Sequence, residues 1–200
     1  DMSFIKPDLY ITVVDPLRPG DEISYYPGET NVLMSDVVII NKIDSAYPED
    51  VEMVRENVRS INPGAVIIDA ASPLSVEDPD AIKGKKVLVV EDGPTVTHGG
   101  MGYGAGYVTA TKFGAGEILD PHPYAKGSIV DTFEKYDHLE DILPAMGYGD
   151  EQVKDLEDTI NAAPCDVVVT GTPIDISRVV KVNKPIFRVR YDLQVIGKPD

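Results

Sequence analysis

The sequence predicts an α/β protein with mostly parallel sheets, and two observations support this fold class. Short runs of apolar, often β-branched residues recur along the chain of 200 residues. Amphipathic helical patterns separate several of these runs, and such alternation is typical of βαβ units, whose strands pair in parallel. Ligands of these sheets bind beyond the carboxyl ends of the strands, so the residues that follow each run are the candidates for function.

Each expected strand is a short apolar stretch bounded by polar residues, glycine or proline. In chain order these strands are Leu9–Val14, Val37–Ile40, Ala65–Ile68, Val87–Val90, Glu117–Leu119, Val167–Val169 and Ile186–Val189.

Two helices have clear start and stop signals. One begins at Pro48, with proline and acids in its first turn, and ends before Asn62-Pro63-Gly64. The other begins at Asp150 and ends before Pro164. Their apolar faces are formed by Val51, Val54, Val58 and Ile61, and by Val153, Leu156 and Ile160.

Composition narrows the class of protein. The net charge of −16 argues against nucleic acid or an anionic membrane as a partner, because both are themselves negatively charged. No apolar run approaches the length needed to span a membrane. The single cysteine, Cys165, excludes an internal disulfide and is expected to be a buried apolar residue. These features predict a cytoplasmic protein.

Asn41-Lys42-Ile43-Asp44 directly follows the run Val37–Ile40, which we expect to be a strand buried on both faces. Asn-Lys-x-Asp at a strand end is the guanine-recognition motif of P-loop GTPases. An ionised Asp44 offers two acceptor oxygens to N–H donors on a guanine edge. Lys42 could lay its aliphatic stem over the base, and Asn41 could tie neighbouring loops together. A polar turn is the alternative, but the position at a strand end favours nucleotide binding.

Two neighbouring strand ends belong to the same prediction. Ala70-Ala71-Ser72 follows the next strand, where GTPases place backbone N–H groups against the base oxygen; Ala71 and Ser72 are the candidates. Asp15-Pro16 ends the preceding strand, and a simple turn or a nucleotide-facing loop would fit it equally well.

The partner motif for phosphates is missing, because no Gly-x-x-x-x-Gly-Lys-Ser/Thr occurs in the sequence. A base-binding loop without a phosphate cradle is half a nucleotide site. We therefore expect the chain to be the carboxyl-terminal part of a longer protein whose P-loop lies upstream, and to be inactive alone. Residues 1–80 would complete a P-loop nucleotide-binding domain, and residues 81–200 would form a second, Rossmann-like domain that binds substrate or phosphate.

Residues 91–106 lead from a strand end into a helical stretch and are rich in glycine. Glycines let backbone N–H groups approach an anion, and the following helix adds its positive end. Acidic side chains here could hold a divalent metal that bridges phosphates. A flexible turn is the alternative. The candidates are Glu91, Asp92 and His98 for catalysis, and Thr95, Thr97, Gly99, Gly100 and Gly102 for binding phosphate or substrate.

Two other interpretations of this region are weaker. Residues 100–105 fit a dinucleotide-binding pattern, with Asp120 at the next strand end, but residues 91–99 separate them from their strand. A zinc site lacks any supporting ligand spacing; its members would be His98, His122 and His138.

Arg188 and Arg190 alternate along the last expected strand and so should face the same side. They are candidates for binding an anionic substrate, and an ion pair on a solvated edge is the alternative. We expect Asp120 and the stretch Thr170–Pro173 to lie at the same sheet edge as residues 91–106.

Several longer segments resemble one family. They are Phe4-Ile5-Lys6-Pro7-Asp8-Leu9, Tyr26-Pro27-Gly28-Glu29-Thr30-Asn31, Val90-Glu91-Asp92-Gly93-Pro94-Thr95, Thr97-His98-Gly99-Gly100-Met101, Ala145-Met146-Gly147-Tyr148-Gly149 and Gly171-Thr172-Pro173-Ile174-Asp175. Together with Asn41–Asp44, they make the chain similar to the carboxyl-terminal half of predicted P-loop GTPases related to archaeal cyclic 2,3-diphosphoglycerate synthetase.

This resemblance implies a ligase-type enzyme that forms a phosphoanhydride in a small phosphorylated acid, using GTP or ATP and Mg²⁺. The anionic substrate would lie at residues 91–106, with Arg188 and Arg190 opposing its charge. A regulatory or chaperone-type GTPase is one alternative, and a dinucleotide-binding Rossmann module is another. The sequence leaves open the substrate, the preferred nucleotide and whether the chain forms a homo-oligomer.

Overall fold

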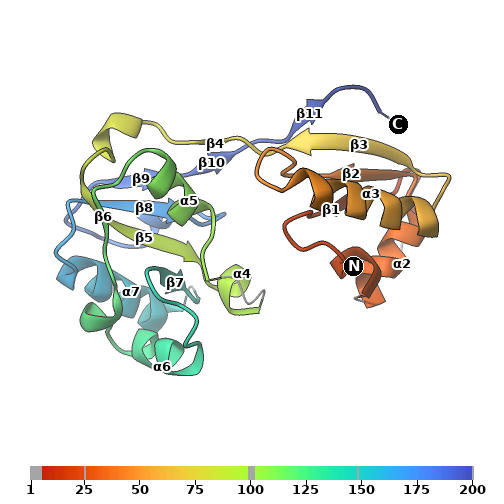
Figure 1. Cartoon of the computed structure of the whole chain (residues 1–200). Coiled ribbons are helices and arrows are strands. Elements are labelled where there is room, and N and C mark those ends of the chain that lie inside the picture. Colours follow the sequence, from red (N-terminus) through yellow and green to blue (C-terminus); the bar gives the residue numbers. More distant parts are fainter. Residues whose placement is uncertain (1–5, 25, 99–101, 148, 200) are drawn as a thin grey trace. The chain divides into compact units, whose positions relative to one another are not determined.

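The computed structural model describes residues 6–24, 26–98, 102–147 and 149–199, which form two compact α/β units (Figure 1). The first unit contains the described residues up to Pro73 and from Tyr191 onward, and the second runs from Leu74 to Arg190. Both units contain parallel sheets with helices between the strands, so the predicted fold class is confirmed. The functional division into residues 1–80 and 81–200 stays a prediction.

The first unit consists of the strands β1 (Ile11–Val14), β2 (Val37–Ile40), β3 (Val66–Ala71) and β11 (Gln194–Ile196), and the helices α1 (Asp21–Ser24), α2 (Tyr26–Met34) and α3 (Pro48–Ile61). The described strands form one sheet in the order β1-β2-β3-β11. β1, β2 and β3 pair in parallel, whereas β11 is antiparallel to β3.

One face of this sheet carries the core of the unit. Val38 and Ile40 of β2 are fully buried there, against Val54 and Val58 of α3. Their burial follows from the apolar stripe of α3, which the spacing of its valines predicts. Figure 1 shows α3 lying along the sheet.

The opposite face of the same sheet is only partly covered. Ile11 and Val13 of β1 are 50% and 56% exposed, and Val37 and Ile39 of β2 are half-buried. The expectation that residues 37–40 are buried on both faces is therefore wrong for this face. The physical reason is that the core of the unit, with the apolar side chains of α2 and α3, packs on the other side.

The strands of the second unit are β4 (Leu74–Ser75), β5 (Lys86–Asp92), β6 (Glu117–Ile118), β7 (Leu143–Ala145), β8 (Val167–Gly171) and β9 (Ile186–Arg188), with β10 (Arg190–Tyr191) at its end. Its helices are α4 (Gly93–His98), α5 (Ala105–Lys112), α6 (Ser128–Lys135) and α7 (Asp150–Ala162), with short 3₁₀ turns η1 (Pro79–Ala81), η2 (His122–Tyr124) and η3 (Ile176–Arg178).

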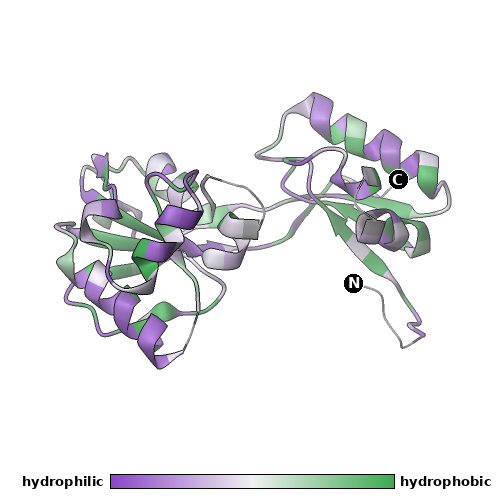
Figure 2. Cartoon of the chain, turned by 90° about the horizontal axis from the view of Figure 1, so that it is seen from below, coloured by the Kyte–Doolittle hydropathy of each residue, from purple (hydrophilic) through white to green (hydrophobic). Residues whose placement is uncertain are grey.

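β5 is the central strand of the second unit. It pairs in parallel with β8 on one side and with both β6 and β7 on the other, and β9 extends the sheet beyond β8. The four residues Val87–Val90 are completely buried, as a central parallel strand requires. Figure 1 shows α5 on one side of the sheet and α6 and α7 on the other, and in Figure 2 the strands are the most apolar elements while the long helices also carry hydrophilic residues.

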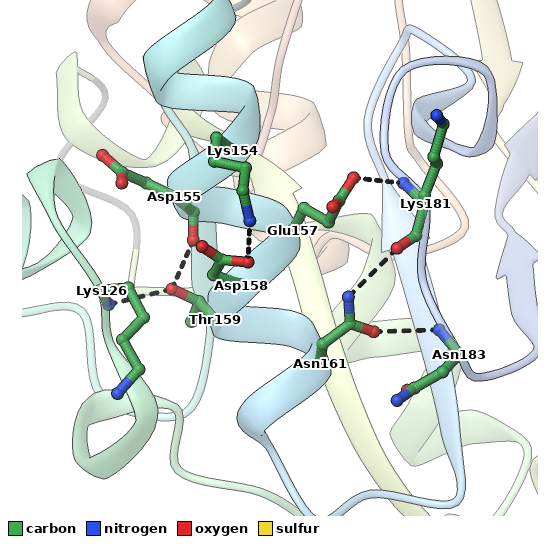
Figure 3. A network of polar contacts seen from close by, with 9 residues as sticks. All are labelled: Lys126, Lys154, Asp155, Glu157, Asp158, Thr159, Asn161, Lys181 and Asn183. Carbon is green, nitrogen blue, oxygen red and sulfur yellow. Dashed lines mark hydrogen bonds and ion pairs between the residues drawn. The ribbon is translucent and has the colours of Figure 1, made fainter.

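Side chains of helix α7 form hydrogen bonds with two separate loops of the second unit (Figure 3). Thr159 accepts the backbone N–H of Lys126 on its Oγ1 at 3.0 Å. Glu157 accepts the backbone N–H of Lys181 at 2.7 Å, and the Asn161 amide donates to the Lys181 carbonyl at 3.1 Å. These bonds hold the chain on both sides of α7 without using any of the predicted site residues.

The remaining expectations concern the single cysteine and membrane-spanning segments. Cys165 is buried, as predicted, and burial raises the pKa of its thiol. Among the described residues, no helix is long and apolar enough to cross a membrane.

Candidate nucleotide-base site

Three loops of the first unit meet where β1, β2 and β3 end. The strands are parallel and in register, with Val14 opposite Ile40 and Ile40 opposite Asp69, so their carboxyl ends share one edge of the sheet. The Asn41 N–H donates to the Val14 carbonyl at 3.0 Å, and the Ile43 N–H donates to the Ala70 carbonyl at 3.2 Å. The Asn-Lys-x-Asp loop is thus anchored to both neighbouring strands.

Lys42 has an unusual backbone conformation in this loop. Its φ of 59° makes it the only non-glycine residue with positive φ in the part of the chain that the structure describes. Lysine seldom adopts this left-handed region, and such residues are often found at functional sites. The N–H groups of Ser45 and Ala46 donate to the Lys42 carbonyl, which stabilises the turn. The Lys42 Nζ lies 2.6 Å from Asp15 Oδ2 at the end of β1.

Asp44 connects the second loop to the third. Its Oδ1 accepts the backbone N–H of Ser72 at 2.9 Å, and the residue itself is exposed. The sequence-based prediction placed Asp44, Lys42, Asn41 and Ser72 at one site, and the structure brings these four residues together. Ala71 lies inside β3, is 6% exposed and stands opposite Gln194 of β11, so its side chain is not part of an open surface.

One buried acceptor at this site lacks a partner. Asn41 Oδ1 is inaccessible to solvent and accepts no hydrogen bond in the structure. A buried oxygen without a donor costs free energy, so such atoms are usually satisfied by a ligand, water or another group. The groups open to a ligand at this loop are the exposed Asp44 carboxylate, which can accept N–H donors of a planar base, and the partly exposed stem of Lys42.

Asp15 is the member of this site that sequence reasoning left undecided between a turn and a nucleotide-facing loop. The structure gives it a contact with the motif itself, through Lys42. In the sequence, the only indication of this role was that Asp15 is an acidic residue directly after β1, the strand that precedes β2 and the Asn-Lys-x-Asp loop. Its significance depended on the pairing of β1 with β2, which the sequence does not state.

A cavity of about 320 Å³ is lined by Asp15 together with residues of β1, α1 and α2. Its lining includes the carboxylates of Asp15, Asp21 and Glu22, and a single guanidinium, that of Arg18. Carboxylates repel the negative charge of a bare polyphosphate. This cavity therefore does not replace the phosphate cradle that the sequence lacks.

The predicted anion cradle of the second unit already holds a carboxylate of the chain itself. Glu91, only 2% exposed, accepts the backbone N–H groups of Gly104 at 3.1 Å and Tyr107 at 2.8 Å on its Oε1. A Cβ atom at Gly104 would lie 2.7 Å from Glu91 Oε2, and one at Gly171 would overlap the same oxygen. Burial raises the pKa of Glu91, and its bonds to backbone N–H groups oppose that shift.

The position of Glu91 affects the predicted anion site in residues 91–106, because Glu91 itself is an anion. The positive end of α5, which would attract an anion, faces Glu91. The N–H groups of Gly104 and Tyr107, at the start of that helix, are engaged by the Glu91 side chain and are not free for a phosphate. The roles assigned to Glu91 and Gly102 stay predictions.

Asp92 and Thr95 form the amino-terminal cap of α4. Asp92 Oδ2 accepts the Thr95 hydroxyl at 2.7 Å and its backbone N–H at 3.3 Å. Thr97 donates its hydroxyl to the Gly93 carbonyl at 2.8 Å within the same helix. The remaining members of the predicted cradle cannot be placed: Gly99, Gly100 and the side chain of His98 lie outside the described part of the structure.

Glu91 and Asp92 are the acidic side chains of this region that could bind Mg²⁺. Glu91 is enclosed by backbone N–H groups and Asp92 caps a helix, so the two carboxylates are not arranged as ligands of one ion. Among the described residues, no group of three or more His, Cys, Asp or Glu side chains could hold a metal.

Arg188 and Arg190 do not share one strand. The strand ends at Arg188, and Arg190 begins a separate strand that pairs with β4. Arg188 donates to the carbonyl of Pro173, and its buried Nε has no hydrogen-bond partner in the structure. Arg190 forms an exposed ion pair with Glu77 at 2.7 Å. The expectation of two arginines on one face of a single strand is wrong, because the chain breaks its pairing at Val189.

Comparison with known proteins agrees with the site in the first unit. Residues 2–69 match the nucleotide-binding domain of the CobW/HypB/UreG family. The predicted resemblance to P-loop GTPases is confirmed over this part of the chain.

Two particular relatives extend the match. Arginine synthetase ArcE from Thermococcus kodakarensis is 60% identical over 199 residues, which is 100% of this chain and 44% of that protein. Cyclic 2,3-diphosphoglycerate synthetase from Thermococcus sibiricus is 33% identical over 91 residues, 45% of this chain and 20% of that protein. The chain thus spans less than half the length of the curated relatives it matches.

Proposed function

We propose that these residues are part of a nucleotide-dependent synthetase, in which the first unit binds the base and the second contributes to the substrate site. The meeting of Asp44 with Ser72 and of Lys42 with Asp15, at the carboxyl edge of one parallel sheet, carries the nucleotide part of this proposal. The 200 residues contain no P-loop, so we propose that a phosphate-binding element outside them completes the site.

The base is proposed to be guanine. Asp44 is exposed and keeps acceptor capacity after its bond to Ser72, so it can accept N–H groups that guanine presents and adenine lacks. Lys42 would contact the face of either base through its stem. Base selection therefore depends on Asp44, whereas Lys42 contributes to the binding of any purine.

Competitive binding of GTP and ATP to the natural full-length protein that contains these residues tests this assignment. The unaltered protein should prefer GTP, and Asp44→Asn should lose about tenfold or more of that preference, corresponding to at least one charge-assisted hydrogen bond. Equal binding of the two nucleotides by the unaltered protein, or an ATP preference that Asp44→Asn leaves unchanged, would refute the guanine assignment.

The reaction is proposed to form arginine. The support is the 60% identity to a protein named arginine synthetase over the whole of this chain. In such an enzyme the nucleotide supplies the phosphoryl group that drives bond formation, and the chain's own contribution is to position the base and the small substrate. Incubation of the full-length protein with nucleotide, Mg²⁺ and candidate precursors should yield arginine, detected by mass spectrometry. Hydrolysis of nucleotide without any arginine would favour a regulatory GTPase instead.

A phosphoryl transfer that closes a phosphoanhydride in 2,3-diphosphoglycerate is the second candidate reaction. The match to cyclic 2,3-diphosphoglycerate synthetase supports it, although that match covers only 45% of this chain. It requires an anion site in the second unit, whose most obvious N–H donors are taken by Glu91. Phosphorus NMR of the same reaction mixtures, supplied with the diphosphoglycerate, distinguishes the two reactions because only the second yields a cyclic phosphoanhydride.

A further inference from the structure

The Asp15 carboxylate is held by one hydrogen bond on one oxygen and forms its ion pair with Lys42 through the other. Asp15 Oδ1 accepts the backbone N–H of Leu17 at 3.1 Å, while its Oδ2 lies 2.6 Å from Lys42 Nζ. The carboxylate side chain is only 17% exposed, and that of the lysine is 37% exposed. The left-handed backbone of Lys42 then sets the direction in which its side chain leaves the loop.

We propose that Asp15 is a positioning residue for nucleotide binding: it holds Lys42 so that the aliphatic stem forms a fixed surface against which a purine base packs. This inference rests on the proposed nucleotide-binding function. A lysine in solution samples many rotamers and loses that freedom when it packs on a ligand. Here the ammonium is anchored before the base arrives, so much of that loss has already occurred in the folded protein.

The pair also determines what kind of contribution Lys42 makes. Its ammonium pairs with Asp15 Oδ2, which also lies 3.4 Å from the Arg18 guanidinium, and the part left to the ligand is the hydrocarbon stem. A stem packs on guanine and adenine alike, because both present a flat face. Asp15 should therefore raise the affinity for GTP and for ATP by similar factors, whereas Asp44 decides between them.

A double-mutant cycle in the natural full-length protein tests this role. Asp15→Asn should weaken the binding of both nucleotides by about three- to tenfold, the usual range of coupling between contacting residues, with the GTP-to-ATP ratio unchanged. Lys42→Ala should weaken both at least as much. The double variant should bind no more weakly than Lys42→Ala, because Asp15 acts only through the lysine.

Asp36→Asn provides a matched control. Asp36 precedes β2 and accepts the Tyr10 backbone N–H at 2.8 Å, so it is also a hydrogen-bonded carboxylate, but it lies at the other end of the strands. Its substitution should leave both affinities unchanged. Lys42→Arg keeps a charge and a hydrocarbon stem, and it should retain most of the binding that Lys42→Ala loses.

Each other outcome contradicts the inference in a recognisable way. If the two substitutions are additive in nucleotide affinity but coupled in the free energy of unfolding, the pair has only a structural role. If Asp15→Asn changes the GTP-to-ATP ratio, Asp15 contacts the base edge directly. If Asp15→Asn does not fold, equal binding by Lys42→Ala and the unaltered protein is sufficient to overturn the role. Failure of the unaltered protein to bind either nucleotide would instead reject the proposed function itself.

Discussion

Glu91 at the end of β5 accepts the backbone N–H of Tyr107 in the first turn of α5 at 2.8 Å. The residues are separated by 16 positions in sequence, yet this bond fills the electropositive end of the helix with a side chain of the same polypeptide. Gly104 and Gly171 leave the space that this internal carboxylate occupies.

Glu91→Gln should reveal the raised pKa of this carboxyl group as a pH-dependent difference in stability. Because burial raises the folded-state pKa above the ordinary value of 4.5, the stability from Glu91 is complete below that value and falls as pH rises through the folded-state pKa. The variant should therefore gain stability relative to the unaltered protein as pH rises above 4.5 and through the folded-state pKa of Glu91. Denaturant unfolding at several pH values measures this, and a flat or opposite difference would contradict it.

Gly171→Ala should destabilise the second unit by about 1–3 kcal/mol, the usual cost of forcing extra volume into a packed site. The added Cβ would overlap the Glu91 carboxylate and lie 2.6 Å from the Gly106 backbone nitrogen. Because that nitrogen belongs to the backbone, it cannot move away as the end of a flexible side chain could. Gly64→Ala is the matched control, since its Cβ would meet only the Asn62 side chain at 3.7 Å. Thermal unfolding of the two variants gives the comparison, and equal midpoints would show that the enclosure of Glu91 is loose.

Asp155→Ala should remove two hydrogen bonds that link α7 to Ser128, the first residue of α6, and should cost about 1 kcal/mol. Asp155 Oδ2 accepts both the N–H and the hydroxyl of Ser128, at 2.9 and 2.8 Å, and these bonds lower its pKa. For a lowered carboxyl pKa, the stabilisation is present above the unfolded-state value and is lost as pH falls through the folded-state value. The deficit of the variant should therefore shrink in acid.

Asp158→Ala is the control for that measurement. Asp158 lies on the same helix and pairs with Lys154, but this pair is exposed and contributes little in water. Its substitution should change the free energy of unfolding by less than about 0.5 kcal/mol. A loss as large as that from Asp155→Ala would show that the two bonds to Ser128 are not the reason for the effect of Asp155 on stability.

Asn41→Ala should affect ligand binding more than folding. Its buried Oδ1 has no partner in the structure, so removing it costs no hydrogen bond in the ligand-free protein, while the lost side chain leaves a gap in the loop that carries Lys42 and Asp44. The increase in melting temperature on adding nucleotide should shrink, with little change in the ligand-free value. Asn62→Ala is the contrasting variant, because the Asn62 amide donates to the carbonyls of Val32 and Ser35 at 3.0 and 2.8 Å. It should lower the ligand-free melting temperature, and the reverse pattern for the two asparagines would refute the assignment.

Local patterns were sufficient for most of the fold. The helix Pro48–Ile61 matches its prediction because its starting proline, its stripe of three valines and one isoleucine, and the stop signal Asn62-Pro63-Gly64 all lie within one segment. β7 was missed because it has only three residues and contains Pro144, which argues against a strand in an interior position. It forms only because β6 leaves the far end of β5 free for pairing.

The sequence by itself determined the strand-end placement of Asn41–Asp44 and Ser72, since parallel βαβ units bring successive carboxyl ends to one edge. Only the tertiary structure decided that Asp15 contacts Lys42 and that Glu91 occupies the amino-terminal end of α5. It also decided that Arg188 and Arg190 belong to different strands. The physical reason is that a motif lists donors and acceptors, whereas their availability depends on which distant groups folding places beside them. Hydrogen bonds between residues far apart in sequence, such as that from Ser72 to Asp44, are products of packing and leave no local pattern to read.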